Sequence, residues 1–446
     1  MAHATSRLAE TLARTAVRAS DGRPLAAPGR SVAGEQRAQA SLIRVGIFGL
    51  FGNGNAGNDG TLEAMLRFLR RAMPDAELTC ICACAPGGPQ KVAADFRVAA
   101  IPLAFPKPAN LLLCMLDKLS FQGPRQLASW IRAVARLRKL DLLIVPGTGI
   151  LGEFRDRPLG MPLALYGWCL AARLCGTRIA FVSVGAGPID HRLSRWLIKS
   201  AAGMAQYRSY RDANSKDFMK GIGVDICNDT VYPDLAFKLP APASTRRQGT
   251  EGGPITVGVG LMTYLGTRND SNRGAAIYAA YLEKITNFVL WLLDQGHLVR
   301  ILMGAEADRC AVADLVAGVA IRRPDLTRDR LIAESVDSLH DLMRQIAETD
   351  VVVATRFHNV VCALKLGKPT VSIGYGDKHD ALMAEMGVGR FCQHVEHLNV
   401  DLLIEQFTQL MLDRQRYERS IRGANLLFQQ RLERQDSILA ARFFQR

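Results

Sequence analysis

The stretch that decides the fold is residues 43–60, which read IRVGIFGLFGNGNAGNDG. Residues 43–49 are mostly apolar apart from Arg44 and predict a β-strand. A loop of glycine and asparagine follows, and we expect a helix to begin at Asp59 or Thr61. Within that helix, apolar side chains recur at the spacing of one helical face: Leu62, Met65, Leu66 and Leu69. A strand, a glycine loop and a helix in succession predict one α/β unit.

The same alternation continues through the first half of the chain. We predict further strands at residues 78–85, 140–145, 178–184 and 206–210, and helices at 163–174 and 194–204. Strands that alternate with helices favour a parallel sheet covered by helices.

A second alternation begins after residues 241–253, which show no apolar periodicity and are interpreted as a linker. Strands are predicted at 255–261, 298–303, 350–354 and 369–373, and helices at 276–295, 338–347, 360–366 and 381–386. The predicted fold class is therefore α/β, with two Rossmann-like domains that face a central cleft.

This pattern divides the chain into five parts. They are a poorly ordered N-terminal extension (1–40), an N-terminal Rossmann-like domain (41–240), the linker (241–253), a C-terminal Rossmann-like domain (254–404) and a C-terminal helical segment (405–446). The last segment places apolar side chains on one helical face with arginines opposite: Tyr417, Ile421, Ala424, Phe428 and Leu432. Such a helix can lie on an anionic membrane surface or pack across the two domains, and we favour packing.

Composition limits the choice of partner and compartment. The net charge of +14 favours anionic partners. No zinc-finger spacing, aromatic RNP-like cluster or basic zipper is present, so we expect no nucleic-acid partner. No apolar run reaches the ~18–20 residues that span a bilayer.

The ten cysteines show no disulfide framework. Cys80, Cys82 and Cys84 alternate along a predicted strand and are interpreted as small apolar side chains rather than a metal site. Free cysteines are typical of a reducing compartment, so we predict a cytoplasmic protein, with the inner face of the membrane as an alternative.

Glycine turns mark the carboxyl ends of three predicted strands. The first loop offers Asn55 and Asn58 to a ligand at a helix N-terminus, although Asp59 is also suited to cap that helix. The second turn contributes Gly147 and Gly149, and the third contributes Gly185 and Gly187. Three such turns at one edge of a parallel sheet predict a shared ligand crevice. Glu153, after the second turn, is a candidate carboxylate base or a member of a solvated acidic loop.

Cationic side chains follow the predicted strands as well. Arg211 ends a short strand, with an exposed salt bridge as its alternative role. Arg356 and His358 follow the apolar strand 350–354, and Lys378 follows the next strand. A guanidinium can form two parallel hydrogen bonds to a carboxylate or phosphate, and an imidazole can move a proton near neutral pH. We therefore predict that Arg356 holds an anion while His358 transfers a proton.

Together, these motifs resemble the polysaccharide pyruvyl transferase family. The resemblance runs from about Val45 to Gly387 and rests on the order of several short motifs. They are the first Gly/Asn loop, Val184–Pro188, Tyr210-Arg211-Asp212 with Ser215, Pro233–Phe237, Arg356-Phe357-His358, and Tyr375 with Lys378. Residues 146–149 depart from the family, which usually shows a run of glycines there.

The resemblance implies a two-Rossmann fold like that of GT-B glycosyltransferases. It also implies a phosphoenolpyruvate donor, a free or lipid-linked glycan acceptor, and a pyruvate ketal product of polysaccharide biosynthesis. Arg211, Arg356 and His358 become donor-binding and catalytic positions, and Lys378 adds a cation. On this reading, His358 is the acid, Asp59 and Glu153 are the candidate bases, and neither a metal nor another cofactor is required.

Two other functions remain open from the sequence. Asp377 and Glu385 stand with seven residues between them, similar to the acid pair of some retaining enzymes, which leaves a nucleotide-sugar glycosyltransferase as an alternative. A non-catalytic relative that scaffolds glycan assembly is the other. Peripheral association with a membrane would suit a lipid-linked acceptor.

Overall fold

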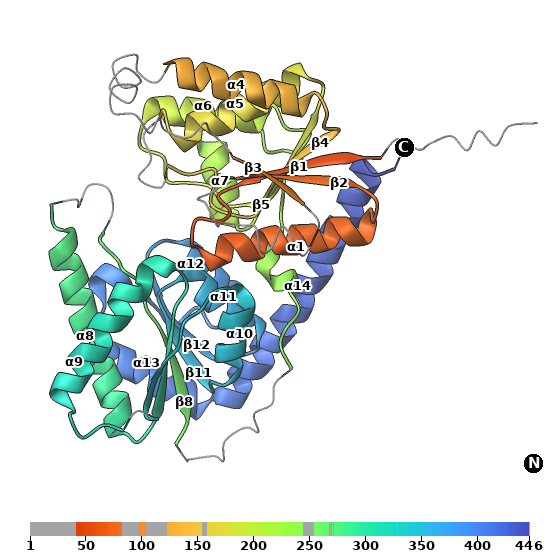
Figure 1. Ribbon diagram of the computed structural model, residues 1–446. Helices are drawn as coiled ribbons and strands as arrows, with labels where there is room; N and C mark the ends of the chain where they lie inside the picture. The colour runs from red at the N-terminus through yellow and green to blue at the C-terminus, as the bar shows by residue number, and fades with distance from the viewer. Residues whose placement is uncertain are drawn as a thin grey trace, which may run out of the picture. The chain divides into compact units, whose positions relative to one another are not determined.

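The fold is given by a computed structural model (Figure 1). It describes residues 42–82, 96, 98–102, 123–153, 158–243, 254–266, 270, 272–327 and 329–445. Contacts between Cα atoms place Leu42–Arg446 in one compact unit. The predicted extension at 1–40 and most of the predicted linker lie outside the described residues.

The first sheet has seven parallel strands in the order β3-β2-β1-β4-β5-β6-β7 (Figure 1). The strands are β1 (Arg44–Gly49), β2 (Glu77–Cys82), β3 (Ala99–Pro102), β4 (Leu142–Pro146), β5 (Arg178–Val184), β6 (Tyr207–Tyr210) and β7 (Thr230–Val231). The order reverses between β1 and β4, as in Rossmann sheets, and such a reversal opens a crevice at the carboxyl ends of the strands.

The second sheet has six parallel strands in the order β10-β9-β8-β11-β12-β13. The strands are β8 (Thr256–Gly260), β9 (Leu298–Leu302), β10 (Leu331–Ala333), β11 (Val351–Ala354), β12 (Thr370–Gly374) and β13 (Cys392–His394). The reversal between β8 and β11 repeats the topology of the first sheet. The prediction of an α/β fold with two Rossmann-like sheets is confirmed.

Helices cover the sheets. The helices of the first sheet's part of the chain are α1 (Ala56–Ala72), α4 (Gly123–Leu137), α5 (Met161–Leu174), α6 (Arg192–Gly203), α7 (Ala213–Gly221) and the short η1 (Leu235–Lys238). With the second go α8 (Gly274–Asp294), η3 (Glu306–Asp308), α9 (Arg309–Arg322), α10 (Leu339–Ala347), α11 (Phe357–Lys365), α12 (Lys378–Glu385), η4 (Val395–His397) and α13 (Val400–Leu412).

Alternation along the strands sends side chains into two cores. On β4, Leu143 and Val145 join the cluster that contains Trp168 of α5 and Ile198 of α6. Their neighbour Ile144 points the other way, into a larger cluster that continues through the second sheet. This period of two makes both faces of a buried parallel sheet apolar, which explains the continuous apolar runs of the sequence.

The first helix begins earlier than predicted. Asn55 caps α1 by accepting a hydrogen bond from the Gly57 amide at 3.0 Å, so the helix starts at Ala56 rather than at Asp59 or Thr61. Asp59 therefore lies in the first turn, where its Oδ1 accepts a hydrogen bond from the Gly52 amide at 2.7 Å. The cap predicted at Asp59 is wrong because Asn55, four residues earlier, performs it.

The C-terminal segment contains α14 (Arg414–Phe443), whose apolar face packs against both sheets' layers. Tyr417, Ile421, Phe428 and Leu432 are buried. Near the end of α14, the amide Nε2 of Gln435 donates hydrogen bonds to Ser183 and Ser209 of the first sheet, at 3.0 and 2.9 Å. At its start, Arg414 pairs with Asp350 of the second. The predicted packing helix is confirmed over the membrane-surface alternative.

The cysteines follow the prediction in part. Cys80 and Cys82 are both buried on the same face of β2, as the alternation predicts. Among the described residues, Cys80 and Cys169 are free thiols, whereas Cys82 is disulfide-bonded, which the sequence reading did not anticipate. No helix of the described residues is long and apolar enough to cross a membrane.

Candidate functional site

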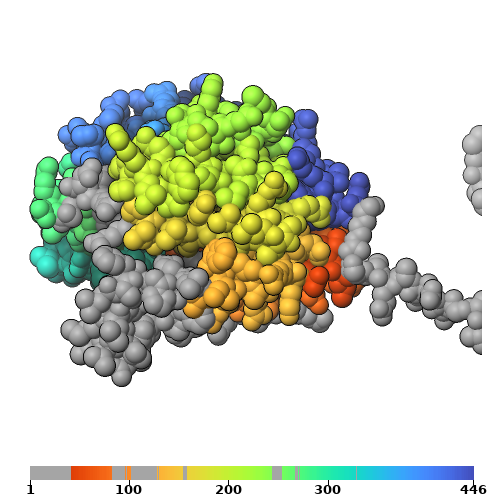
Figure 2. Space-filling view, turned by 90° about the horizontal axis from the view of Figure 1, so that it is seen from above, coloured from red at the N-terminus to blue at the C-terminus, as the bar shows by residue number. Residues whose placement is uncertain are grey.

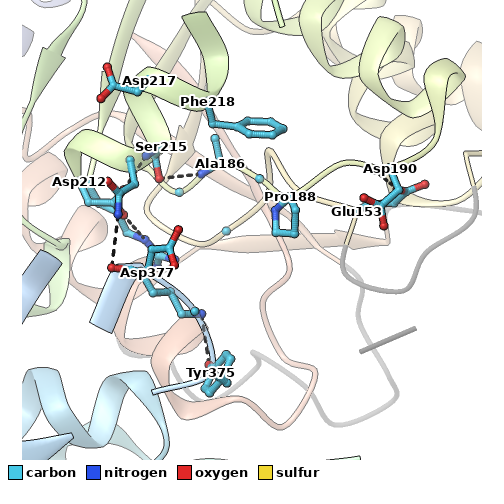
Figure 3. Close-up of a pocket in the computed structure, with 17 residues that line it drawn as sticks. Glu153, Ala186, Pro188, Asp190, Asp212, Ser215, Asp217, Phe218, Tyr375 and Asp377 are labelled. Carbon is cyan, nitrogen blue, oxygen red and sulfur yellow. Dashed lines mark hydrogen bonds and ion pairs between the residues drawn. The ribbon is translucent and has the colours of Figure 1, made fainter. Parts of the chain in front are cut away.

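A cavity of about 700 Å³ opens at the carboxyl ends of the strands (Figure 3). Gly149, Gly185 and Gly187, from the turns after β4 and β5, line one side. Arg211 follows β6, and residues 375–378 close the cavity from the turn after β12. The predicted crevice thus exists, and both sheets contribute to it. We call Arg211, Tyr375 and Lys378 the cationic wall.

Arg211 is held in this wall by its surroundings. Its side chain is 7% exposed, and its guanidinium packs on Gly185, where any Cβ would lie 2.7 Å from Nε. Nη1 donates to Asp234 Oδ2 at 3.4 Å, and the guanidinium carbon lies 4.8 Å from the centre of the Phe357 ring. Nε is buried and makes no hydrogen bond among the described residues, although it lies 3.6 Å from Asp212 Oδ2 in an ion pair. A buried, unsatisfied guanidinium nitrogen beside a cavity is suited to an anionic ligand.

Lys378 brings a second cation to the same wall. Its ammonium donates to the Tyr375 hydroxyl at 3.2 Å and lies 5.4 Å from the centre of the Phe357 ring. Burial lowers the pKa of Lys378, and the neighbouring Arg211 acts in the same direction. Burial would raise the pKa of Tyr375, but Lys378 and Arg356 outweigh it, so that pKa lies below its ordinary value. The lowered pKa of Tyr375 shows that positive charge is concentrated here, which favours an incoming anion.

His358 stands behind this wall rather than in it. The residue is in the first turn of α11, its side chain is 12% exposed, and it is absent from the lining of the cavity. Its ring occupies the space that a side chain at Gly57 would fill, since a Cβ there would lie 2.0 Å from Nδ1. Gly57, which the sequence assigned to a ligand loop, therefore makes room for His358.

The surroundings of His358 decide its protonation, whereas its predicted role as the acid stays a prediction. Burial lowers the pKa of His358 to about 4, and Arg211, Lys378 and Arg356 act in the same direction, against the opposing effect of Asp234. Nε2 is buried, lacks a hydrogen-bond partner among the described residues, and lies 3.9 Å from Asp234 Oδ2. The ligand-free imidazole is therefore neutral at pH 7.

Arg356 has its guanidinium engaged by a buried carboxylate. Nε and Nη2 donate to the two oxygens of Asp308, at 2.8 and 2.6 Å. Asp308 is fully buried and also accepts from the amides of Thr263 and Ala305. The pair of parallel hydrogen bonds predicted for a substrate is thus made within the protein. Arg356 does not line the cavity.

Asp234 is a residue that the sequence reading left out of the site. It precedes η1, where its Oδ1 accepts from the Ala236 amide at 3.0 Å. Its Oδ2 faces both Arg211 and His358. Asp234 lies in the Pro233–Phe237 motif of the family resemblance, which is the signal in the sequence that points to it. Asp234 links the cationic wall to the imidazole.

The two carboxylates predicted as bases have structural partners. Glu153 accepts hydrogen bonds from the amides of Asp190 and His191 and from the Ser194 hydroxyl, so it holds the segment that leads into α6. It lines the cavity at the end away from Tyr375 (Figure 3). Asp59 braces the first loop and is not in the lining. Burial raises the pKa of Asp59, against the hydrogen bond from Gly52.

Some of the remaining predicted ligand-binding residues line the cavity, and others do not. Asn55 caps α1, and Asn58 donates to the Leu50 carbonyl at 3.1 Å. Gly147 adopts a positive φ of 51° and lies against Thr61, where a Cβ would be 1.9 Å from that side chain. None of these three lines the cavity, whereas the other predicted glycines do.

A family comparison now identifies the chain. Residues 55–377 match the profile of the family described as polysaccharide pyruvyl transferase. That match covers more than half of the sequence. The chain belongs to the polysaccharide pyruvyl transferase family. A search of curated proteins finds no match.

Solved structures share the fold of this pyruvyl transferase family member at low identity. The UDP-GlcNAc 2-epimerase of Neisseria meningitidis, bound to UDP-GlcNAc, is 11% identical, with a TM-score of 0.53, over 88% of this chain and 100% of that one. The Anabaena protein HepE, in complex with UDP and glucose, is 13% identical, with a TM-score of 0.53, over 87% and 95%. The UDP-GlcNAc 2-epimerase of Methanocaldococcus jannaschii is 9% identical, with a TM-score of 0.53, over 86% and 99%. These likenesses confirm the predicted GT-B-like architecture.

The acid pair weighed for a nucleotide-sugar enzyme is separated in this pyruvyl transferase family member. Asp377 lines the cavity, and Figure 3 shows its carboxylate beside the cationic wall. Glu385, at the end of α12, instead pairs with Arg431 of α14 at 2.8 Å. The described residues contain no group of three or more His, Cys, Asp or Glu side chains placed to hold a metal ion.

Proposed function

We propose that this transferase moves the pyruvyl group of phosphoenolpyruvate onto two hydroxyls of one glycan sugar. One sugar oxygen bonds to C2 of the donor while C3 of the donor takes up a proton and becomes a methyl group. The C2–O bond to phosphate then breaks, and the second sugar oxygen bonds to C2 to close the ketal. Each hydroxyl loses its proton, one proton goes to C3, and the other leaves with the phosphate.

The observation that carries this proposal is the cationic wall. Phosphoenolpyruvate has a carboxylate and a phosphate on a three-carbon frame, so its site needs several cations close together. Arg211 offers a buried Nε without a hydrogen-bond partner among the described residues, and Lys378 offers an ammonium beside the same cavity. In a site with little water, such fixed cations stabilise developing phosphate charge well. Arg356 supports the wall from behind rather than binding the donor, because Asp308 holds it.

His358 starts the cycle as a neutral imidazole in this proposal. An anionic donor at the cationic wall offsets Arg211 and Lys378, which are two of the groups that lower the pKa of His358. The imidazole then gains basicity, and Asp234 stabilises the imidazolium. His358 thus takes a proton from a sugar hydroxyl and returns it to the donor, which joins the base and acid roles in one residue.

The acceptor has a separate part of the cavity. Phe218 of α7 presents its ring near Ala186 and Pro188 (Figure 3), where the apolar face of a sugar can stack. The exposed carboxylates of Asp190 and Asp377 stand on opposite sides of the cavity and can accept hydrogen bonds from sugar hydroxyls. An aromatic ring beside several acceptors fits a polyhydroxylated glycan.

Phosphate release tests the proposal. The protein is incubated with phosphoenolpyruvate and a panel of free and lipid-linked saccharides. We expect phosphate release with at least one acceptor, together with a product whose mass rises by one pyruvate less one water. Transfer from a nucleotide sugar, with no phosphate from phosphoenolpyruvate, would overturn the proposal in favour of a glycosyltransferase.

A further inference from the structure

Three outer helices of the first sheet carry basic and apolar side chains and no acids. The helices α4, α5 and α6 contain no Asp or Glu in the ranges Gly123–Leu137, Met161–Leu174 and Arg192–Gly203. They do contain the exposed side chains of Arg173, Arg192, Arg195 and Lys199 and the half-buried Arg132, whereas Arg136 of α4 lines a separate pocket with Glu77. Figure 2 looks onto this side of the first sheet, where α4 is orange, α5 yellow and α6 yellow-green. We call it the α4–α6 face.

Large apolar side chains are exposed on the α4–α6 face. Trp196 is 53% exposed and Ile131 is 59% exposed, and Leu174 is 66% exposed at the end of α5. Leu193 and Trp130 are exposed to a lesser extent. Removing such side chains from water is favourable, and several large apolar side chains exposed on one face indicate an interaction site.

Contacts between the helices show that these side chains belong to one surface. The Trp196 ring lies 5.3 Å from the ring of Tyr166 on α5. On the other side of α5, Trp130 approaches Gly167, where a Cβ would lie 3.7 Å from its ring. Two exposed tryptophans therefore flank the outer surface of α5. Tryptophan, with an apolar body and one N–H, is typical of the boundary between water and lipid.

We propose that the α4–α6 face docks on an anionic membrane surface. Basic side chains draw it to anionic headgroups, and the tryptophans and leucines enter the boundary with the acyl chains. The absence of any acid from the three helices supplies the charge complementarity. The C-terminal helix, which the sequence offered for this role, packs its apolar face inside the protein instead.

The position of the face relative to the cavity agrees with this docking. Asp190 lines the cavity, and α6 begins two residues later at Arg192. Glu153, also in the lining, accepts a hydrogen bond from the amide of His191, the residue just before that helix. An acceptor sugar on a lipid carrier would then approach the cavity from the membrane side. The docking itself does not depend on the proposed pyruvyl transfer.

Vesicle sedimentation tests the docking with the full chain. We expect binding to vesicles of phosphatidylcholine with phosphatidylglycerol, and at least tenfold weaker binding to pure phosphatidylcholine or at high salt. The variants W196Q and R192E/K199E should each bind the anionic vesicles at least tenfold more weakly. Circular dichroism melts establish that each variant is folded.

Matched controls change equally exposed side chains elsewhere. L426Q/L427Q alters two leucines of α14 that are about 60% exposed, and R309E/R419E reverses two exposed arginines on α9 and α14. Both should bind like wild type. The proposal would be overturned if these control variants lost vesicle binding while W196Q and R192E/K199E kept it. Binding to heparin without binding to vesicles would overturn it too, because a polyanion would then be the partner.

Tryptophan fluorescence keeps the test independent of any variant. Lipids brominated near the headgroup should quench emission when the wild-type protein binds anionic vesicles, because Trp130 and Trp196 enter the boundary layer. Sedimentation with vesicles but no quenching would contradict docking through this face.

Discussion

The buried imidazole of His358 faces the buried carboxylate of Asp234, with 3.9 Å between Nε2 and Oδ2. Asp234 favours the imidazolium, whereas burial and the cations Arg211, Lys378 and Arg356 oppose it. The balance leaves His358 neutral, with a pKa of about 4. An anionic donor at the cationic wall would change that balance, and this gives the site its expected pH behaviour.

Binding of phosphoenolpyruvate is expected to take up protons. Because the donor's negative charge raises the pKa of His358, uptake of up to about one proton per donor should occur near pH 6. Titration calorimetry in buffers with different ionisation enthalpies measures this number. H358Q should show a smaller uptake, while H397Q, which alters an exposed histidine of η4, should match wild type. Equal uptake in H358Q would mean that another group titrates.

The variant D234N should slow turnover, and the affinity for the donor is measured separately because Asp234 also holds Arg211. Asparagine keeps an oxygen for the Ala236 amide but removes the charge that stabilises the imidazolium. We expect kcat to fall by about 10²-fold, the size of a typical acid–base contribution. Steady-state rates of phosphate release measure it. An unchanged kcat would separate Asp234 from the proton transfer.

The lowered pKa of His358 should also make the stability of the folded protein depend on pH. The pKa of His358 is lowered in the folded protein, so the unfolded chain binds more protons between pH 6.5 and 4. Stability is therefore full above pH 6.5 and falls as the pH drops, by up to about 3 kcal/mol at pH 4. Urea midpoints at pH 7 and 5 should shift less in H358Q than in wild type. Equal shifts would assign the acid sensitivity to other groups.

The ion pair of Arg356 and Asp308 should be structural. D308N leaves a guanidinium that is 18% exposed without its carboxylate, at an expected cost of about 3–5 kcal/mol in the free energy of unfolding. The matched control is E283Q, which breaks an exposed pair with Arg322 and should cost less than about 1 kcal/mol. Urea denaturation compares the two. A cost of D308N no larger than that of E283Q would show that Asp308 does not hold Arg356.

Glu153 should support α6 rather than act as a base. E153Q keeps an oxygen for the amides of Asp190 and His191, but it removes the negative charge and turns an NH2 group toward the Ser194 hydroxyl, so we expect a loss of about 1–3 kcal/mol in stability. Phosphate release, assayed well below the melting temperature, should stay within a few-fold of wild type. Complete loss of turnover in a folded E153Q would restore the catalytic role.

The sequence predicted the interior of both sheets but missed their edges. Its strands match the buried ones, such as β5 and β11, because buried parallel strands are continuous apolar runs. The four missed strands are β3, β7, β10 and β13, which are the edge strands of the two sheets. Each has four residues or fewer and includes exposed or half-buried positions. In segments this short, the alternation of apolar and polar residues is too brief to identify a strand.

The sequence predicts which site residues follow strands, but it does not predict the hydrogen-bond and ion-pair partners of those residues. Arg211 and Lys378 reach the cavity because both follow strands, and that position is visible in the sequence. Asp308, which binds Arg356, is 48 residues away in the sequence. Asp234, which faces His358, follows the first sheet, whereas His358 follows a strand of the second. Neither pair can therefore be predicted from neighbouring residues in the sequence. The role of Gly57 in accommodating His358 was hidden for the same reason.

The central claim is that the cationic wall binds phosphoenolpyruvate, and titration calorimetry with this donor tests it most directly. Wild type should bind phosphoenolpyruvate, and R211M and K378M should each bind it at least about tenfold more weakly, since each loses a charged hydrogen bond. R309M, which alters an exposed arginine of α9, should bind like wild type. Undiminished binding in both wall variants, or binding of UDP-GlcNAc but not phosphoenolpyruvate, would contradict the account.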